Sequence, residues 1–240
     1  MINKKKYLWI VLLSLNVYTL LHAQSYWFGA KGGAGMNFQS WGDGTSGNVN
    51  RDPLFSINGD IIIESYDEFK SGALYAQLGY HTRGSSLQFF SFNNAFTDRQ
   101  GFKFNNIVLE LGAKKAFNLD KELNSYFILG LRGEYTISNN LDNFLYLANP
   151  YTPHSVFVRK INYGVTAGGG FEMPMSELVN VFVEFSIQPD ISLQYEQPPA
   201  RVIDPWQPNQ TIELGLRQVR NLSLELKVGV KFLRKVEYID

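Results

Sequence analysis

The lengths of the connections between alternating segments constrain this chain more than any other feature of its sequence. Near the C-terminus, apolar residues occupy every second position from Leu222 to Phe232, with Glu225 and Lys227 among the residues between them. This period of two is that of a β-strand. Seven further segments alternate similarly, and the eight span residues 25–39, 53–66, 71–83, 102–117, 124–137, 158–173, 179–193 and 221–233. Along the chain, the connections between them are long, short, long, short, long, short and long.

This regularity predicts an all-β fold, an eight-stranded antiparallel transmembrane barrel of the outer-membrane type. Such barrels have an even number of strands, short periplasmic turns and long extracellular loops. Most segments are also longer than the roughly five or six residues of strands in soluble sheets. A soluble all-β domain, such as a lipocalin-like barrel, is the alternative, because each alternating segment is a weak signal when taken alone.

The N-terminus predicts export from the cytoplasm. Lys4, Lys5 and Lys6 precede an uncharged stretch, residues 7–21, and Ala23 supplies a small residue for cleavage. This is the layout of a signal peptide over residues 1–23. An N-terminal membrane anchor is the alternative, but the apolar run falls short of the roughly 20 residues that a spanning helix needs. We expect residues 24–240 to form one barrel domain, with 234–240 as a short periplasmic tail.

Composition excludes several classes of function. The chain has 22 basic and 22 acidic residues, three of the basic ones within the predicted signal peptide, so the remainder carries 19 − 22 = −3. Nucleic-acid binding, which needs a dense basic surface, is therefore not expected. The absence of cysteine excludes disulfides, thiol chemistry and Cys-based zinc sites. Beyond residue 23, no apolar run is long enough for a transmembrane helix.

If the apolar face of each strand meets lipid, the polar face lines the barrel interior. An eight-stranded barrel is just wide enough for its side chains to fill, and buried charges must pair. The expected interior is a plugged network of ion pairs, and a narrow conduit is the alternative. Its predicted members are Lys31, Asp60, Glu64, Gln77, His81, Glu110, Lys114, Arg132, Glu134, Thr166, Glu172, Glu184, Glu225, Lys227 and Lys231.

No catalytic, metal or cofactor site is expected. His81 is predicted to join the interior network, and His154 to be an exposed loop residue. No nucleophile elbow, zinc-binding helix motif or phosphate loop is present. Residues 43–48 have the composition of a calcium loop but lack its spacing and terminal Glu.

Aromatic residues cluster near the ends of the predicted strands and in the long loops. Those near strand ends predict girdles at the two membrane interfaces: Tyr26, Trp27, Phe38, Trp41, Tyr66, Tyr80, Phe102, Phe117, Tyr126, Tyr135 and Tyr238. In the loops, Tyr146, Tyr151 and Trp206 are candidate contacts with a partner protein. Packing of the loops into a cap over the barrel mouth is an equal alternative.

The Gly-rich stretch of residues 29–37 (GAKGGAGMN), the eight strands, the unequal loops and the ending at residues 220–234 resemble Bacteroidota outer-membrane barrels. Among these, the chain is most similar to the PorT-type family, some of whose members take part in type IX secretion. The resemblance implies no catalytic residues. It implies an integral outer-membrane location, with lipid and, through the long loops, other envelope or secretion proteins as partners.

The last strand also resembles in part the signal read by the barrel-assembly machinery, through Gly229 and Phe232. Arg234 stands where a second aromatic residue is usual, and the chain continues to Asp240.

Together these observations predict a non-enzymatic, integral outer-membrane barrel that is an accessory or structural component of a protein-secretion machine. A small adhesion, surface-shielding or ligand-binding barrel is the alternative. A narrow channel or a barrel enzyme is the third possibility.

Overall fold

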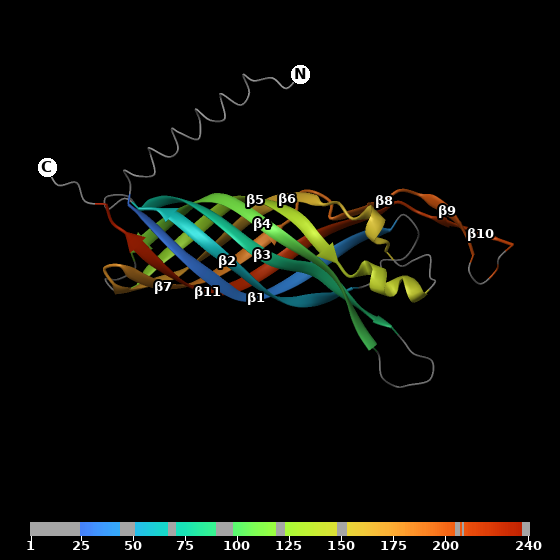
Figure 1. The fold of residues 1–240 in the computed structure, drawn as a ribbon, viewed down its shortest axis with the longest axis horizontal. Coiled ribbons are helices and arrows are strands. Elements are labelled where there is room, and N and C mark those ends of the chain that lie inside the picture. The colour runs from blue at the N-terminus through green and yellow to red at the C-terminus, as the bar shows by residue number, and fades with distance from the viewer. Residues whose placement is uncertain are drawn as a thin grey trace, which may run out of the picture.

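Eight long antiparallel strands close into a barrel (Figure 1). The structure is a computed structural model that describes residues 25–43, 51–66, 71–89, 98–118, 123–147, 153–204, 207 and 209–236. Each barrel strand pairs with the next, and the last closes on the first from Tyr26↔Arg234 to Asp43↔Arg217. The strands are β1 (Tyr26–Asp43), β2 (Asp52–Ser65), β3 (Gly72–Phe89), β4 (Asp98–Asn118), β5 (Asn124–Asn139), β6 (Ile161–Ser176), β7 (Val179–Pro189) and β11 (Arg217–Arg234). The predicted fold class is confirmed.

Short and long connections lie at opposite ends of the barrel. The β2–β3, β4–β5 and β6–β7 connections are short and lie at the end where β1 begins and β11 stops (Figure 1). The longer connections lie at the other end.

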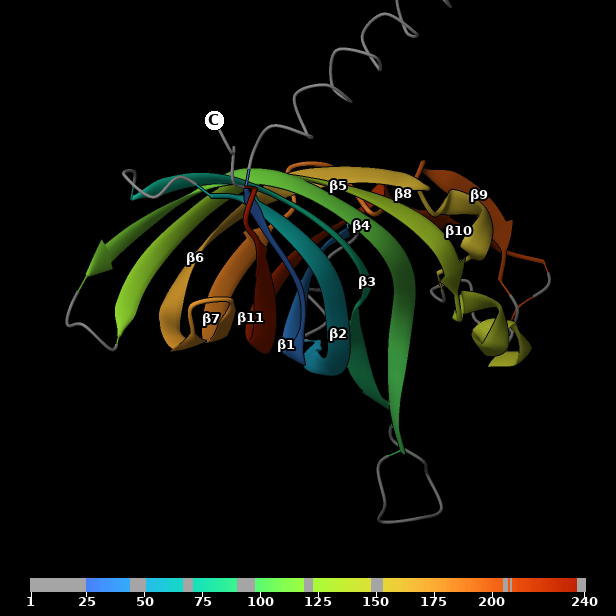
Figure 2. The same cartoon turned by 60° about the vertical axis from the view of Figure 1, so that its left-hand side comes forward.

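Several strands differ in length from the prediction on the long-loop side. β3 continues to Phe89 and β4 begins at Asp98, and the two remain paired to their tips, so that they extend beyond their neighbours (Figure 2). β7 instead stops at Pro189 rather than at residue 193. Beyond it, Asp190 forms only an isolated bridge with Gly164. Above a membrane, neither face needs to be apolar, so the alternation that marks a strand in sequence fades while backbone pairing continues.

The long connections contain ordered elements that the sequence pattern did not predict. Two 3₁₀ helices, η1 (Leu141–Leu147) and η2 (Ser155–Phe157), follow β5. After β7, the strand β8 (Tyr195–Gln197) pairs with β11. Next, β9 (Ala200–Ile203) and β10 (Thr211–Leu214) form a two-stranded ribbon that projects from the barrel (Figure 1). No helix among the described residues is long and apolar enough to cross a membrane.

The barrel is inside out relative to a soluble protein. Along β5, buried and exposed positions alternate, and those exposed from Phe127 to Ile137 carry no charge: Leu131 is 71% exposed, whereas its neighbour Arg132 is 2% exposed. On β11, Leu222, Leu226 and Phe232 are likewise exposed. An uncharged apolar belt therefore surrounds a polar interior, as predicted.

The prediction of aromatic girdles was wrong for part of its set. Phe38, Tyr80, Phe117 and Tyr135 lie exposed on the outer face. The four that are buried instead are Trp27, Trp41, Phe102 and Tyr126. Nearness to a strand end does not decide direction, because successive side chains point to opposite faces. Trp27 and Trp41 are even-numbered steps from Lys31 on the same strand, so they share its inward face. Tyr238 lies outside the described residues.

Candidate functional site in the barrel interior

The interior charges predicted from the alternation all lie buried within the barrel. Lys31, Asp60, Glu64, Glu110, Lys114, Arg132, Glu134, Glu172, Glu184, Glu225, Lys227, Lys231 and His81 are each at most 9% exposed, as are Gln77 and Thr166. Eight acids and seven lysines or arginines are buried among the described residues, so the interior is close to charge balance. A balanced interior favours pairing within the protein over selection of a passing ion.

Inward-facing glycines make room for the long charged side chains. At Gly79, a Cβ atom would lie 2.1 Å from Oδ1 of Asp60, and at Gly229 it would lie 2.4 Å from the ring of Phe182. Small and large residues thus alternate across the narrow lumen, as small barrels require. Gly229, predicted as part of the insertion signal, therefore has a packing role as well.

The centre of the network joins β2, β3 and β11. The Nζ atom of Lys227 lies 2.7 Å from Oδ2 of Asp60 and 2.6 Å from Oε2 of Glu225. Nε2 of His81 lies 2.7 Å from Oδ1 of Asp60. Each of these carboxylates therefore has a cation or a ring nitrogen within hydrogen-bond distance, which offsets the cost of removing charge from water.

Arg83 connects this centre to the opposite wall, and the sequence prediction missed it. Its guanidinium is fully buried and donates to Glu225 at 2.9 Å, to Glu134 at 2.8 Å and to Oε1 of Gln188 at 2.7 Å. The predicted strand 71–83 includes Arg83 as its last residue, but the predicted interior set does not. Counting every second residue onward from Tyr75 on β3 would have placed it inside.

Arg132 extends the network toward β7. It lies 2.6 Å from Glu134 through Nε and pairs with Asp190 through Nη2. Asp190 also accepts a hydrogen bond of 2.7 Å from Asn221. The prediction missed Asp190 because it follows the proline that ends the regular strand.

A four-membered ring of charges lies at the periplasmic end. Lys114 lies 3.2 Å from Glu64 and 2.6 Å from Glu172, and Lys231 lies 3.2 Å and 2.7 Å from the same two acids. The Nζ of Lys231 also lies 4.7 Å from the ring centre of the inward-facing Trp27. These residues, called the charge ring below, close the lumen at this level.

A small cavity lies against the charge ring and is lined by Glu64, Lys114 and Lys231 together with polar and apolar residues of the neighbouring strands. It has about 20 Å³ of space for water, which is enough for roughly one water molecule. On one side, Lys31 pairs with Glu184 at 2.5 Å, and the hydroxyl of Tyr126 donates to the same carboxylate at 3.1 Å.

Glu110 differs from the other predicted acids. It is fully buried, yet no cation lies within ion-pair distance among the described residues. Its two oxygens accept short hydrogen bonds of 2.6 Å from the hydroxyls of Tyr75 and Thr166. Its polarity is therefore satisfied by neutral donors.

An uncharged polar layer lies between the centre and the extracellular mouth. Ser223 donates to Asn37 at 2.6 Å, and Gln194 donates to Thr136 at 2.8 Å. Asn221 bonds Gln194 at 3.2 Å. The predicted interior set omitted these residues because they carry no charge. Asn37, Asn221 and Ser223 nevertheless lie an even number of positions from inward-facing charged residues on the same strands.

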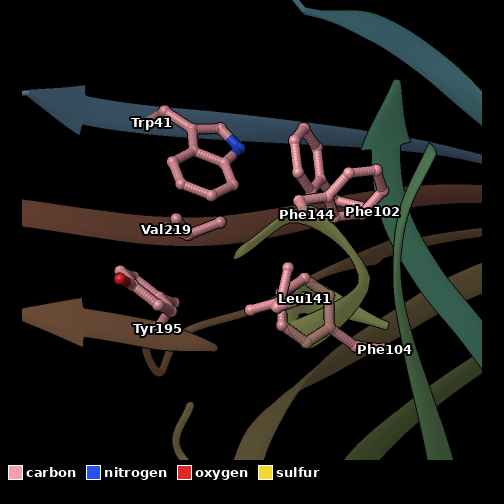
Figure 3. Close-up of a cluster of buried hydrophobic side chains, with 7 residues drawn as sticks. All are labelled: Trp41, Phe102, Phe104, Leu141, Phe144, Tyr195 and Val219. Atoms are coloured by element: carbon pink, nitrogen blue, oxygen red, sulfur yellow. The ribbon is translucent and has the colours of Figure 1, made fainter. Parts of the chain in front are cut away.

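A cluster of buried apolar side chains lies at the end of the barrel with the long connections, the predicted extracellular mouth (Figure 3). This aromatic cap gathers residues of β1, β4, β8, β11 and η1, together with Phe157 and Val158: Trp41, Phe102, Phe104, Leu141, Phe144, Tyr195 and Val219. The rings of Phe102 and Phe144 are 4.7 Å apart, and those of Trp41 and Tyr195 are 5.8 Å apart. Of the two predicted outcomes for the loops, the cap is present for the loop after β5 and for the start of the loop after β7.

The remaining predicted residues are placed as follows. His154 is partly buried, and its backbone N–H donates to the Tyr195 hydroxyl at 3.2 Å. Phe232 lies on the outer face, 5.8 Å from the ring of Phe28. The partner-contact side chains of Tyr146, Tyr151 and Trp206 lie outside the described residues, as do residues 1–23 and 237–240. Among the described residues, no cluster of His, Asp or Glu is arranged to hold a metal ion.

Similarity to a known family identifies the class of membrane protein to which this chain belongs. The family model of the outer membrane protein beta-barrel domain matches residues 22–193. The chain belongs to this family. This outer-membrane barrel thus resides in the outer membrane, its long loops facing outward from the cell and its apolar belt facing lipid. The match is to a broad family, so the resemblance to PorT-type barrels of Bacteroidota stays a prediction.

Solved structures of outer-membrane proteins are similar to this chain at low sequence identity. OprG from Pseudomonas aeruginosa is similar at a TM-score of 0.51 and 8% identity, covering 88% of this chain and 97% of that one. Neisserial surface protein A gives 0.45 at 12% identity, with coverage of 86% and 96%. The N-terminal barrel domain of Pseudomonas aeruginosa OprF gives 0.42 at 11%, with coverage of 88% and 98%. Comparison with curated proteins finds no significant match in sequence.

Proposed function

We propose that this outer-membrane barrel is a sealed, non-enzymatic scaffold that acts as an accessory component of an envelope protein-secretion machine. The filled lumen is the observation that carries the proposal. The aromatic cap, the Arg83 centre and the charge ring occupy successive levels of the interior. When the lumen is filled in this way, only the loops and the outer surfaces of the barrel are available to contact other molecules.

The projecting ribbon is the surface best suited to meet a partner. Residues of β9 and β10 pair only with each other, from Ala200↔Leu214 to Ile203↔Thr211. An isolated two-stranded ribbon is marginally stable in water, and a partner that covers it would stabilise it. Ile203 is 67% exposed. The predicted contact residue Trp206 lies between the two strands in sequence.

Conductance tests whether the lumen is sealed. In planar bilayers, the purified barrel should give no stepwise current. A steady open-channel current in the unmodified protein would contradict the sealed scaffold and support the narrow conduit instead.

Site-specific photo-crosslinking in native outer membranes tests the partner. A photoreactive residue at Ile203 should form an adduct with a protein required for secretion, identified by mass spectrometry. The matched control is Ile57, which is 84% exposed on the lipid-facing side of β2 and should form no such adduct.

Deletion of the ribbon separates secretion from adhesion. Replacing residues 198–215 by a short Gly-Ser turn should abolish the adduct and reduce protein export, while the barrel still migrates in a heat-modifiable way. Unchanged export together with lost binding to a host surface or soluble ligand would favour the adhesion or ligand-binding alternative and overturn the secretion role.

A further inference from the structure

The two rims of the apolar belt treat their cations differently. At the periplasmic rim, Nζ of Lys115 donates to the hydroxyl of Ser71 at 2.6 Å. Arg234 donates to the Tyr26 hydroxyl at 2.9 Å, and its guanidinium lies 5.6 Å from the same ring. Both rim cations therefore have protein partners.

At the extracellular rim, three exposed cations have none. Lys103 on β4, Lys160 just before β6 and Arg220 on β11 make no side-chain hydrogen bond or ion pair with any described residue. On β4, Lys103 is the second outward position beyond Ile107, where the exposed apolar residues of that strand end. On β11, Arg220 is the next outward position above Leu222, and Lys160 directly precedes the exposed Ile161.

Two acids in the long connections at this end of the barrel are already engaged. Glu196 pairs with Arg159, and Asp142 accepts a 2.5 Å hydrogen bond from Ser155. The rim thus presents unneutralised positive charge at the level where a lipid leaflet passes from hydrocarbon to headgroup. Basic residues at such a level are attracted to anionic headgroups.

We infer that Lys103, Lys160 and Arg220 form a binding annulus for the phosphate groups of anionic outer-leaflet lipids. Hydrocarbon chains would lie against the apolar belt, while the headgroup phosphates meet the three cations. This inference does not rest on a role in secretion, since it concerns the lipid surroundings of the barrel.

Lipid titration of matched double variants tests the annulus. The barrel in neutral detergent is titrated with a diphosphorylated lipid A, and bound lipid is counted by native mass spectrometry. Lys103→Gln with Arg220→Gln should weaken binding by about 5-fold for each cation removed, or about 30-fold together. The control, Lys115→Gln with Arg234→Gln, removes the same two residue types from the periplasmic rim and should bind like the unmodified protein.

Three results of the lipid titration would overturn the inference, and a fourth comes from competition with inorganic phosphate. The first is an equal loss of binding in both double variants, and the second is no loss in either. The third is equal affinity for the same lipid after its phosphates have been removed. Inorganic phosphate is the remaining arm: it should displace the lipid only weakly, and efficient displacement would indicate a site for soluble anions instead. Heat-modifiable migration of each variant verifies that it folds.

Discussion

At the extracellular end of the lumen, the side chains that meet are aromatic and aliphatic, whereas at the periplasmic end they are lysines and glutamates. Both sets point inward from strands of the same barrel. The aromatic cap draws residues from η1 and β8 as well as from the wall, so loops close it. The charge ring draws its four members from the wall strands β2, β4, β6 and β11 alone.

A narrow barrel can therefore be filled by apolar packing at one end and by ion pairs at the other. The cap depends on removing apolar surface from water, which is not an attraction between charges and is therefore not screened by a salt such as sodium chloride. The ring depends on attraction between charges, which salt weakens where water reaches them. The charges of the Arg83 centre, which lies between the cap and the ring, are fully buried. Dissolved salt therefore screens the attraction between them least. Substitutions at the three levels should therefore differ in both size and salt dependence.

The largest effect is expected at the centre. Arg83→Met would remove the one cation that contacts both Glu134 and Glu225, leaving Arg132 beside the first acid and Lys227 beside the second. Because this network is fully buried, losing one of its charges costs about 3–5 kcal/mol. The free energy of unfolding in urea, measured in detergent micelles, should fall by that amount. Arg83→Lys, which keeps the charge but loses the fork of donors, is the control and should lose less. If Arg83→Met and the unmodified protein had nearly the same free energy of unfolding, the buried acids would not depend on the Arg83 guanidinium.

The cap should respond next. Phe104→Ala removes a fully buried ring, and Phe→Ala substitutions in packed cores cost about 3 kcal/mol or more. The decrease should be the same at low and high salt. As a matched control, Phe127→Ala removes an exposed ring from the lipid face and leaves the cap intact. A strong dependence on salt would contradict the apolar origin of this seal.

A smaller loss is expected at the charge ring. Lys114→Met leaves Glu64 and Glu172 with Lys231 as their remaining cation. The side chains of Lys114 and Glu64 are also 9% and 11% exposed, so we expect a cost of about 1–2 kcal/mol, below that at the fully buried Arg83. The difference between variant and unmodified protein should shrink as salt rises, because the ring lies near water. If urea unfolding gave a salt-independent loss as large as that at Arg83, the two levels would not differ in kind.

The smallest effect is expected on the ribbon. Arg201 and Glu213 pair across β9 and β10, but their side chains are 76% and 68% exposed. Such surface pairs contribute about 0.5 kcal/mol or less. Arg201→Ala should leave barrel unfolding unchanged within error. Any large loss would mean that the ribbon is coupled to the barrel more tightly than its position suggests.

Period-two alternation and the lengths of the connections were sufficient to predict the number of strands, their direction and which face is polar. They were insufficient at the ends of the strands. The β3–β4 ladder runs on to Phe89↔Asp98 through polar residues, because backbone pairing there needs no apolar face. Trp27 and Trp41 show a second limit at the strand ends. An aromatic residue there can face either lipid or the interior, and only its even or odd spacing from an inward residue such as Lys31 decides which.

Each strand segment by itself determined which of its side chains face inward, because successive side chains in an extended chain point to opposite sides. Lys31, Glu110 and Lys227 were placed in the interior on that ground alone. Only the closed tertiary structure decided which charges meet. Arg83 joins acids that are 51 and 142 residues away along the chain. Such partners are set by the register of every strand pair and by the final closure of β11 on β1, and neither is written in any one segment.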